Sequence, residues 1–319
     1  EFAKGHTKKA VLGSLLIVGA LGMATTASAQ LASVDGHVIN KKDGAHVGGG
    51  GYNKATGRYS TVGGGATNEA TGTNSTVSGG FFNQATGTDS TIGGGNNNEA
   101  TGTNSTVGGG ATNRAEGTDS TIAGGRGNQA TGTGSFAAGV GNKANAENAV
   151  ALGKNNSITG TNSVAIGSNN TIGSGKQDVF ILGSNTDTKD AQSGSVLLGH
   201  ETAGKAATTV EDAEVGGLSL TGFAGVSKAN NNNGTVSVGK KGKERQIVNV
   251  GAGQIRADST DAVNGSQLYA LASTIDKEVN DILEEVGVLD DEIADINDEI
   301  ADINDELKGF AAHVDDQDK

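Results

Sequence analysis

Six consecutive blocks of fifteen residues run from Gly51 to Val140 and read GYNKATGRYSTVGGG, ATNEATGTNSTVSGG, FFNQATGTDSTIGGG, NNNEATGTNSTVGGG, ATNRAEGTDSTIAGG and RGNQATGTGSFAAGV. Self-similarity at a fixed short period is typical of a solenoid, in which each repeat stacks on the one before it. One aliphatic residue precedes the small residues in each block, and this position recurs from Val47 to Leu198 at spacings of 14 to 16 residues. The sequence therefore predicts a mainly β protein with a parallel β-roll over residues 47–200.

Two columns of this repeat should face the interior of the roll. Side chains on a strand alternate between its two faces, so the aliphatic residue and the residue two positions before it point the same way. The earlier position is Ser in the first repeats and a large apolar residue in the later ones, which predicts a thinner, more polar core at the N-terminal end. The expected aliphatic column comprises Val47, Val62, Val77, Ile92, Val107, Ile122, Ala137, Leu152, Ile166, Leu182 and Leu198. The second column comprises Ser60, Ser75, Ser90, Ser105, Ser120, Ser135, Val150, Val164, Phe180 and Val196.

Composition narrows the fold further. The chain has 54 Gly among 319 residues, with no Pro and no Cys. High glycine without proline or a glycine at every third residue excludes collagen, and the absence of cysteine excludes disulfides, thiolate zinc sites and cysteine nucleophiles. The glycines after the aliphatic column and the recurring Asn at 53, 68, 83, 98, 113 and 128 are expected in left-handed conformations at the corners of the coil.

The first 29 residues read as a secretory signal peptide. Lys4, Lys8 and Lys9 precede an apolar run, and a cleavage pattern follows at Ala27-Ser28-Ala29. This order of basic, apolar and small residues is typical of a signal peptide, and the apolar run is too short for a comfortable membrane span. We expect an exported protein in which residues 1–29 are removed and residues 30–46 lead into the roll.

Residues 201–265 lose the period and read as a polar connector. Short alternating runs at 234–239 and 245–250 predict two strands. The asparagine-rich run at 230–234 predicts an exposed loop.

Residues 266–319 read as a coiled coil. In the identical consecutive heptads 293–299 and 300–306, both core positions are Ile, which favours trimers or tetramers over dimers. Residues 276–319 hold 17 acidic and 3 basic residues, whereas the rest of the chain holds 19 acidic and 20 basic residues, so the predicted stalk is acidic and the body is near neutral. The expected seam comprises Leu268, Ile275, Val279, Ile282, Val286, Leu289, Ile293, Ile296, Ile300, Ile303, Leu307 and Phe310.

The order of these segments resembles that of the trimeric autotransporter adhesins, with their YadA-like head, neck and stalk. The resemblance is carried by SVAIG-type repeats (Ser163–Gly167), the run ERQIVNV (244–250) and TDAVNGSQL (Thr260–Leu268) directly before the heptads. The N-terminal EFAKGHTKK (1–9) and the IADINDE heptads are most similar to the ubiquitous surface protein A adhesins of Moraxella. The resemblance implies a left-handed β-roll head, a neck and a parallel homotrimeric stalk. Because the chain ends within heptads, we expect a fragment without the C-terminal membrane anchor.

The function that this resemblance implies is adhesion at the bacterial cell surface, after export through the outer membrane. The implied partners are host matrix proteins of the fibronectin or laminin class, or epithelial surface receptors. We expect no enzyme activity, because no H-E-x-x-H or G-x-S-x-G motif occurs in the chain. We also expect no cofactor, no metal site and no nucleic-acid partner.

Ligand contacts are expected at columns that vary between blocks, since constant columns build the roll. The candidates are Tyr52, Phe81, Phe82, Arg114 and Arg126, which are residue types enriched in binding hot spots. Packing of Phe81 and Phe82 at a subunit interface is an equal alternative. Two other functions stay open: a passive surface spacer, and an ice- or crystal-binding array formed by columns of Thr.

Overall fold

The computed structural model describes residues 36–39, 43–226 and 233–317. The expected signal peptide, residues 1–29, lies outside the described residues. The chain divides into two compact units, one formed by Glu1–Val210 with Ser227–Arg245 and the other by Glu211–Val226 with Gln246–Lys319.

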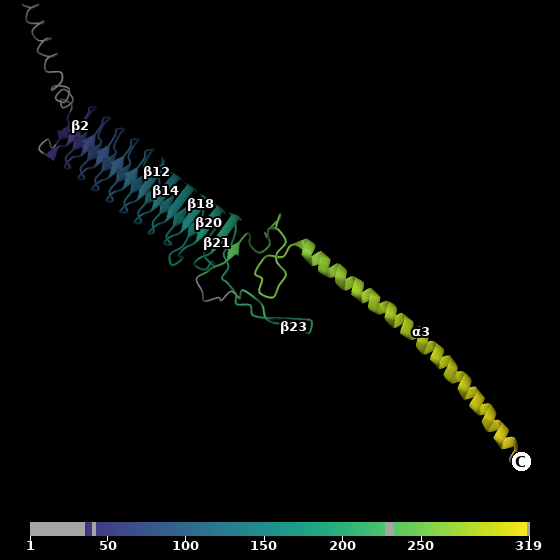
Figure 1. Ribbon diagram of the computed structural model, residues 1–319. Helices are drawn as coiled ribbons and strands as arrows, with labels where there is room; N and C mark the ends of the chain where they lie inside the picture. Colours follow the sequence, from purple (N-terminus) through teal and green to yellow (C-terminus); the bar gives the residue numbers. More distant parts are fainter. Residues whose placement is uncertain (1–35, 40–42, 227–232, 318–319) are drawn as a thin grey trace, which may run out of the picture. The chain divides into compact units, whose positions relative to one another are not determined.

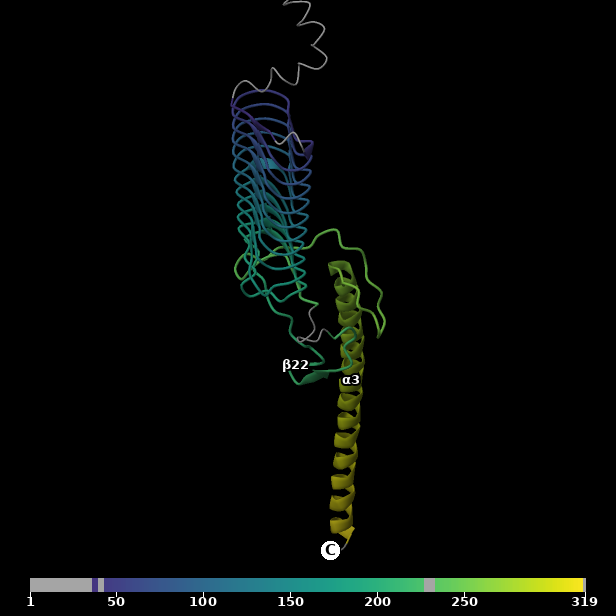
Figure 2. The same ribbon diagram turned by 90° about the vertical axis from the view of Figure 1, so that its left-hand side faces the viewer.

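The first unit is a parallel β-solenoid, and the expectation of a β-roll is confirmed. Alternate strands along the chain belong to two long sheets, so each coil of the chain adds one strand to each sheet (Figure 1). Figure 2 shows these coils stacked one on another. The 10-stranded sheet contains β1 (Val38–Ile39), β3 (Lys54–Ala55), β5 (Glu69–Ala70), β7 (Gln84–Ala85), β9 (Glu99–Ala100), β11 (Arg114–Ala115), β13 (Gln129–Ala130), β15 (Lys143–Ala144), β17 (Ser157–Ile158) and β19 (Thr171–Ile172).

The second sheet has 12 strands and extends beyond the repeats. It contains β2 (His46–Val47), β4 (Thr61–Val62), β6 (Thr76–Val77), β8 (Thr91–Ile92), β10 (Thr106–Val107), β12 (Thr121–Arg126), β14 (Phe136–Val140), β16 (Val150–Lys154), β18 (Val164–Ser168), β20 (Phe180–Ser184), β21 (Val196–His200) and β24 (Val236–Ser237). The strand expected at 234–239 is present as β24, which pairs in parallel with β21. The last coil of the solenoid is therefore completed by a segment of the connector.

Small and large residues share the core between the two sheets. In the early coils the 12-stranded sheet contributes Val or Ile and the 10-stranded sheet contributes Ala, as in Val77 and Ala85. In later coils the sizes are exchanged, as in Ala151 and Ile158. Because protein interiors are close-packed, this exchange fills a core of similar volume while the large side chain moves from one sheet to the other.

The inward register of the later coils differs from the prediction. The structure pairs Ala137 with Ala151, and this column continues through Ala165, Ile181 and Leu197, all of which are buried. The expected inward residues Leu152, Ile166, Leu182 and Leu198 lie one position further along each strand and point outward. Their companions Val150, Val164, Phe180 and Val196 are also outward and partly exposed, and the second buried column is continued instead by Ala149, Ser163, Val179 and Ser195.

The cause is a single-residue change in repeat length. Between β12 and β14 the pairing skips one residue, because Ile122 pairs with Ala137 but Gly124 pairs with Ala138. Later coils thus have one residue fewer between the buried position and the corner glycine. In the later coils the residue directly before this glycine therefore points outward instead of inward, because successive side chains in a strand point to opposite faces.

The recurring Asn side chains are buried and do not adopt the expected left-handed conformation. From Asn53 to Asn170 they form a ladder along one corner; for example, Asn98 Nδ2 donates to Asn83 Oδ1 at 3.0 Å and to the carbonyls of Gly94 and Gly110. Positive φ angles occur instead at the residue before each early Asn, such as Phe82 with φ 55°. The buried amide satisfies backbone carbonyls that the corner removes from the sheets.

The second unit contains a short hairpin and one long helix. Strands β22 (Ala213–Val215) and β23 (Leu218–Leu220) pair antiparallel, and α3 (Gly265–Gln317) is a continuous helix of 53 residues (Figure 1). The strand expected at 245–250 does not form, because this run has no pairing partner in its own chain. The expected loop at 230–234 lies largely outside the described residues.

Candidate functional site

The structure brings Phe81, Phe82, Tyr52 and Arg126 to one corner of the solenoid. Phe81 and Arg126 lie in a single column of parallel bridges that runs from Gly51 through successive coils. Three coils separate Phe81 from Arg126, which corresponds to about 14 Å at the usual spacing of strands. Tyr52 and Phe82 occupy the next position along the same corner, where each has a positive φ.

The rings of Phe81 and Phe82 contact each other at this corner, and both side chains are exposed. Their ring centroids are 4.2 Å apart with an interplanar angle of 72°, and the side chains are 45% and 43% exposed. A bulky residue at φ 55° is strained by about 1–3 kcal/mol. Neither ring contributes to the core, so burial within this chain does not offset the strain at Phe82.

Tyr52 differs from the phenylalanines in what it covers. Its ring lies over Gly36, with Cδ1 2.8 Å from the position that a Cβ on Gly36 would take. The side chain is nevertheless 73% exposed. Tyr52 therefore leans toward the first coil and leaves most of its ring accessible.

Arg114 does not join this corner. It lies on β11 of the 10-stranded sheet, where Nε is 3.0 Å from Glu99 and an Nη is 2.5 Å from Glu116. Its charge is thus compensated within the chain. Arg126 forms no ion pair among the described residues.

A second surface, which the sequence analysis missed, is the outward face of the later coils. β16, β18, β20 and β21 each present two apolar side chains there, and Leu152 and Leu182 are 40% and 50% exposed. Contiguous exposed apolar surface of this kind is typical of a protein interface. The alternating apolar pattern of SVAIG was a signal, but it was assigned to the wrong face.

The helix α3 presents a comparable apolar stripe. The predicted seam residues are all exposed in the single chain, between 47% for Val286 and 70% for Phe310. No helix in the described part of the chain is long and apolar enough to cross a membrane. An apolar stripe with heptad spacing is suited to contact with other helices.

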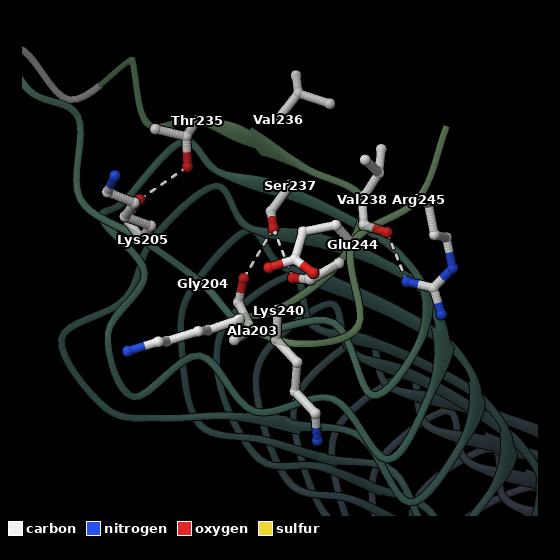
Figure 3. Close-up of a pocket in the computed structure, with 12 residues that line it drawn as sticks. Ala203, Gly204, Lys205, Thr235, Val236, Ser237, Val238, Lys240, Glu244 and Arg245 are labelled. Carbon is white, nitrogen blue, oxygen red and sulfur yellow. Dashed lines mark hydrogen bonds between the residues drawn. The ribbon is translucent and has the colours of Figure 1, made fainter. Parts of the chain in front are cut away.

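A pocket in the connector also escaped the sequence analysis. It has a volume of about 730 Å³ and is lined by residues 203–205 and 235–241 together with Glu244 and Arg245. Figure 3 shows Thr235 and Ser237 donating hydrogen bonds to the backbone carbonyls of Lys205 and Ala203, while Val236 points away. The lysine-rich run GKKGKER (239–245) was the sequence feature that could have indicated this site.

The carboxylates beside this pocket are held ionised. Lys240 and Lys243 lie 2.8 Å and 2.5 Å from Glu201 Oε2, and their hydrogen bonds and charges lower the pKa of Glu201 to about 2. The backbone N–H of Gly242 donates to Glu244 at 2.9 Å and lowers the pKa of that carboxyl. Among the described residues, no group of three His, Cys, Asp or Glu side chains is placed to bind a metal ion.

Three comparisons with known proteins find partial matches to this chain. Residues 246–290 match the family described as "Coiled stalk of trimeric autotransporter adhesin". An 87-residue segment is 39% identical to autotransporter adhesin BtaE of Brucella suis biovar 1 (strain 1330) and covers 27% of this chain but 11% of that protein. The C-terminal YadA-like domain of BPSL2063 from Burkholderia pseudomallei matches with 32% identity over 40% of this chain and 50% of that one, with a TM-score of 0.28.

The match to the stalk family overlaps the expected stalk, residues 266–319, over residues 266–290 and begins within the expected connector, residues 201–265. The matching family and the curated relative are adhesins rather than enzymes. The chain spans about one ninth of the length of that relative, from the 11% covered.

Proposed function

We propose that this chain is the head-to-stalk part of a trimeric adhesin on a bacterial cell surface, exported through the outer membrane, and that it attaches to host extracellular-matrix proteins or epithelial receptors. The stalk match at residues 246–290 carries the proposal, because it ties the solenoid to a family of adhesins. The similarity of residues 1–9 and of the IADINDE heptads extends the proposal to the ubiquitous surface protein A adhesins of Moraxella.

Two exposed apolar surfaces support a parallel homotrimer. The seam of α3 has Ile at both core positions of two heptads, a pattern that favours more than two helices. The outward face of β16, β18, β20 and β21 also needs cover, and three copies of the solenoid packed by these faces would provide it. Both surfaces would then be buried in a single assembly.

The proposed ligand contact is the corner that bears Phe81 and Phe82. The two rings are exposed, and Phe82 is held in a strained conformation that gives nothing to the core. A positive φ recurs at this position in neighbouring coils, as at Thr67 and Asn97, so the conformation belongs to the fold and the exposure of the two rings carries the proposal. Fibronectin and laminin are the first ligands to test, because the family resemblance implies partners of this class.

The test is binding of the intact chain to immobilised fibronectin and laminin. Phe81→Ala with Phe82→Ala is expected to weaken binding while the oligomer mass stays unchanged. Asn96→Ala with Asn97→Ala is the matched control, because these residues occupy the same two corner positions one coil further on.

Two other results have clear meanings. Unchanged binding by the phenylalanine variant would refute the corner, and dissociation of the oligomer would place the two rings at a subunit interface instead. If the native chain binds no matrix protein and no cell-surface receptor, a passive spacer is the better description.

A further inference from the structure

Beyond the proposed adhesion corner, the connector carries a concentrated positive charge. We define the basic neck cluster as Lys205, Lys240, Lys241, Lys243 and Arg245. Four of these residues lie within the six residues Lys240–Arg245, and no seven-residue window elsewhere in the described chain holds four Lys or Arg residues. A basic run of this density is typical of sites that bind polyanions.

A tight turn presents the cluster. The backbones of Lys240 and Lys243 bond to each other, with Lys243 N 2.8 Å from Lys240 O. Gly242 takes φ 77°, which allows the chain to reverse over two residues. Lys241 therefore stands at the exposed tip of the turn.

The two carboxylates beside the cluster leave most of its charge uncompensated. Five cations and two anions, Glu201 and Glu244, give a net charge of 5 − 2 = +3. Glu201 forms ion pairs with Lys240 and Lys243. Lys205 and Lys241 form no ion pair among the described residues, so their ammonium groups are available to an external anion.

Hydrogen bonds hold the guanidinium of Arg245 beside the pocket. Its guanidinium donates to the carbonyls of His200 and Val238, at 2.6 Å and 2.5 Å, and to Thr202 Oγ1 at 3.2 Å. None of these acceptors is a carboxylate, so the positive charge of Arg245 is not neutralised. Figure 3 shows the guanidinium bonded to Val238 beside the pocket.

We propose that the basic neck cluster binds a sulfated polysaccharide. The pocket of about 730 Å³ is open beside the turn, and the side chains that line it are cationic, hydroxyl and small apolar groups together with the single carboxylate of Glu244. No aromatic side chain lines it, so bases of a single-stranded nucleic acid would find no stacking surface. One short turn also contacts fewer charges than the extended basic track that duplex DNA needs. Closely spaced sulfates on a flexible sugar chain match a compact set of lysines.

The inference does not depend on the adhesion corner. A lone chain carries the complete cluster, and in the proposed trimer three copies would raise the apparent affinity for a long polysaccharide. A chain that fails to bind matrix protein could therefore still bind the sulfated sugar, and the reverse also holds.

The experiment measures binding of the intact chain to heparin at about 0.15 M salt, where distant surface charges are largely screened. Lys205→Gln with Lys241→Gln is expected to weaken binding about tenfold, because two exposed ion pairs are lost. Lys143→Gln with Lys154→Gln removes the same net charge from exposed positions on the solenoid and is expected to change binding less than twofold.

Two further probes test the chemical class. Hyaluronan, which carries carboxylates but no sulfates, and duplex DNA are both expected to bind at least about tenfold more weakly than heparin, because specific recognition here requires dense sulfates. Equal losses in the two double variants would overturn the site. Equal binding of hyaluronan or DNA would overturn the sulfated class, and no binding of heparin by the native chain would overturn the proposal outright.

Discussion

At the scale of single residues, the buried Asn ladder replaces much of an ordinary hydrophobic core. Most of these amides donate to their counterpart in the preceding coil and to two backbone carbonyls, as Asn98 does with Asn83, Gly94 and Gly110. A ladder of polar groups in which every member is satisfied defines a unique register. At the first described coil, His37 Nδ1 takes the place of the Asn oxygen and accepts the N–H of Asn53 at 3.1 Å.

We expect Asn98→Ala to destabilise the solenoid by about 2–4 kcal/mol, because it leaves the buried N–H of Asn113 and the carbonyls of Gly94 and Gly110 without their side-chain partner. The measurement is the midpoint of thermal unfolding followed by circular dichroism. Asn96→Ala, two residues away and exposed, is expected to change the stability by no more than about 0.5 kcal/mol. Equal midpoints for the two variants would show that the ladder does not stabilise the fold.

Glu201 gives the connector a pH dependence of known sign. Its folded pKa of about 2 lies below the ordinary value of 4.5 because of hydrogen bonds and charge from Lys240 and Lys243. A lowered folded pKa stabilises the protein above the ordinary value, and this contribution disappears as the pH falls toward the folded value. It should therefore be lost between about pH 4.5 and pH 2.

The readout is hydrogen exchange at the amide of Ala203, which bonds to Gly239 at 3.0 Å. Near neutral pH the native chain should protect this amide more than Glu201→Gln does, and the difference should vanish near pH 2. A difference that persists at pH 2 would contradict the assignment of the effect to Glu201.

The residue scale also shows where the sequence could not predict the candidate site. Phe81 and Phe82 were identifiable because they interrupt constant columns, and the structure places them together at a corner. Arg114 varies in the same way, but it lies on the other sheet between Glu99 and Glu116. Variation along the chain does not reveal which residues already have a partner.

At the scale of strands and helices, the repeat period predicted the solenoid but not the face of its later strands. In SVAIG, alternation allows either Val164 with Ile166 or Ala165 to point inward. The usual preference for large apolar residues inside selected the first, and the structure has the second. The rule failed because this outward face is apolar. We propose that another copy of the chain covers it, and in the sequence of one chain such an interface cannot be distinguished from a core.

The proposal that this outward face is a trimer interface can be tested by disulfide crosslinking, because the chain contains no native cysteine. In a trimer packed through these strands, Ile166→Cys places identical thiols near the common axis, and mild oxidation should produce covalent dimers. Lys143→Cys, on the exposed side of the 10-stranded sheet, should stay uncrosslinked. If only the Lys143 variant crosslinks, or neither does while the trimer mass is retained, the face is not the interface.

The acidic helix α3 should be stabilised by salt. The segment 276–319 has a net charge of −14, and three such helices side by side repel one another. Adding salt should raise the melting midpoint of the helical signal at 222 nm, because screening reduces the repulsion. A midpoint that falls on adding salt would show that carboxylate repulsion does not limit the stalk.

At the scale of the whole molecule, two of the exposed apolar surfaces are best explained by association between copies of the chain. The stripe of α3 and the outward face of the later coils are costly in a monomer, since large apolar patches promote aggregation. Association also multiplies the weak contacts that a shallow corner such as Phe81 and Phe82 can make. The sequence analysis favoured trimers or tetramers from the Ile-rich heptads and took the trimer from the family resemblance, but it could not place the second interface without the register of the strands.

The final prediction is that adhesion requires this association. Sedimentation equilibrium of the native chain should return about three times the mass of one chain, and Ile293→Asp with Ile300→Asp should dissociate it by placing charges in the seam. Ala294→Asp with Ala301→Asp adds the same charges outside the seam of the same heptads and should leave the mass unchanged. Because three linked heads bind with an effective concentration that one head lacks, the dissociated variant should lose about 100-fold or more in apparent affinity for an immobilised ligand. A tetramer would contradict the family's oligomer number, and a folded monomer that binds as tightly as the native chain would show that a single head is sufficient.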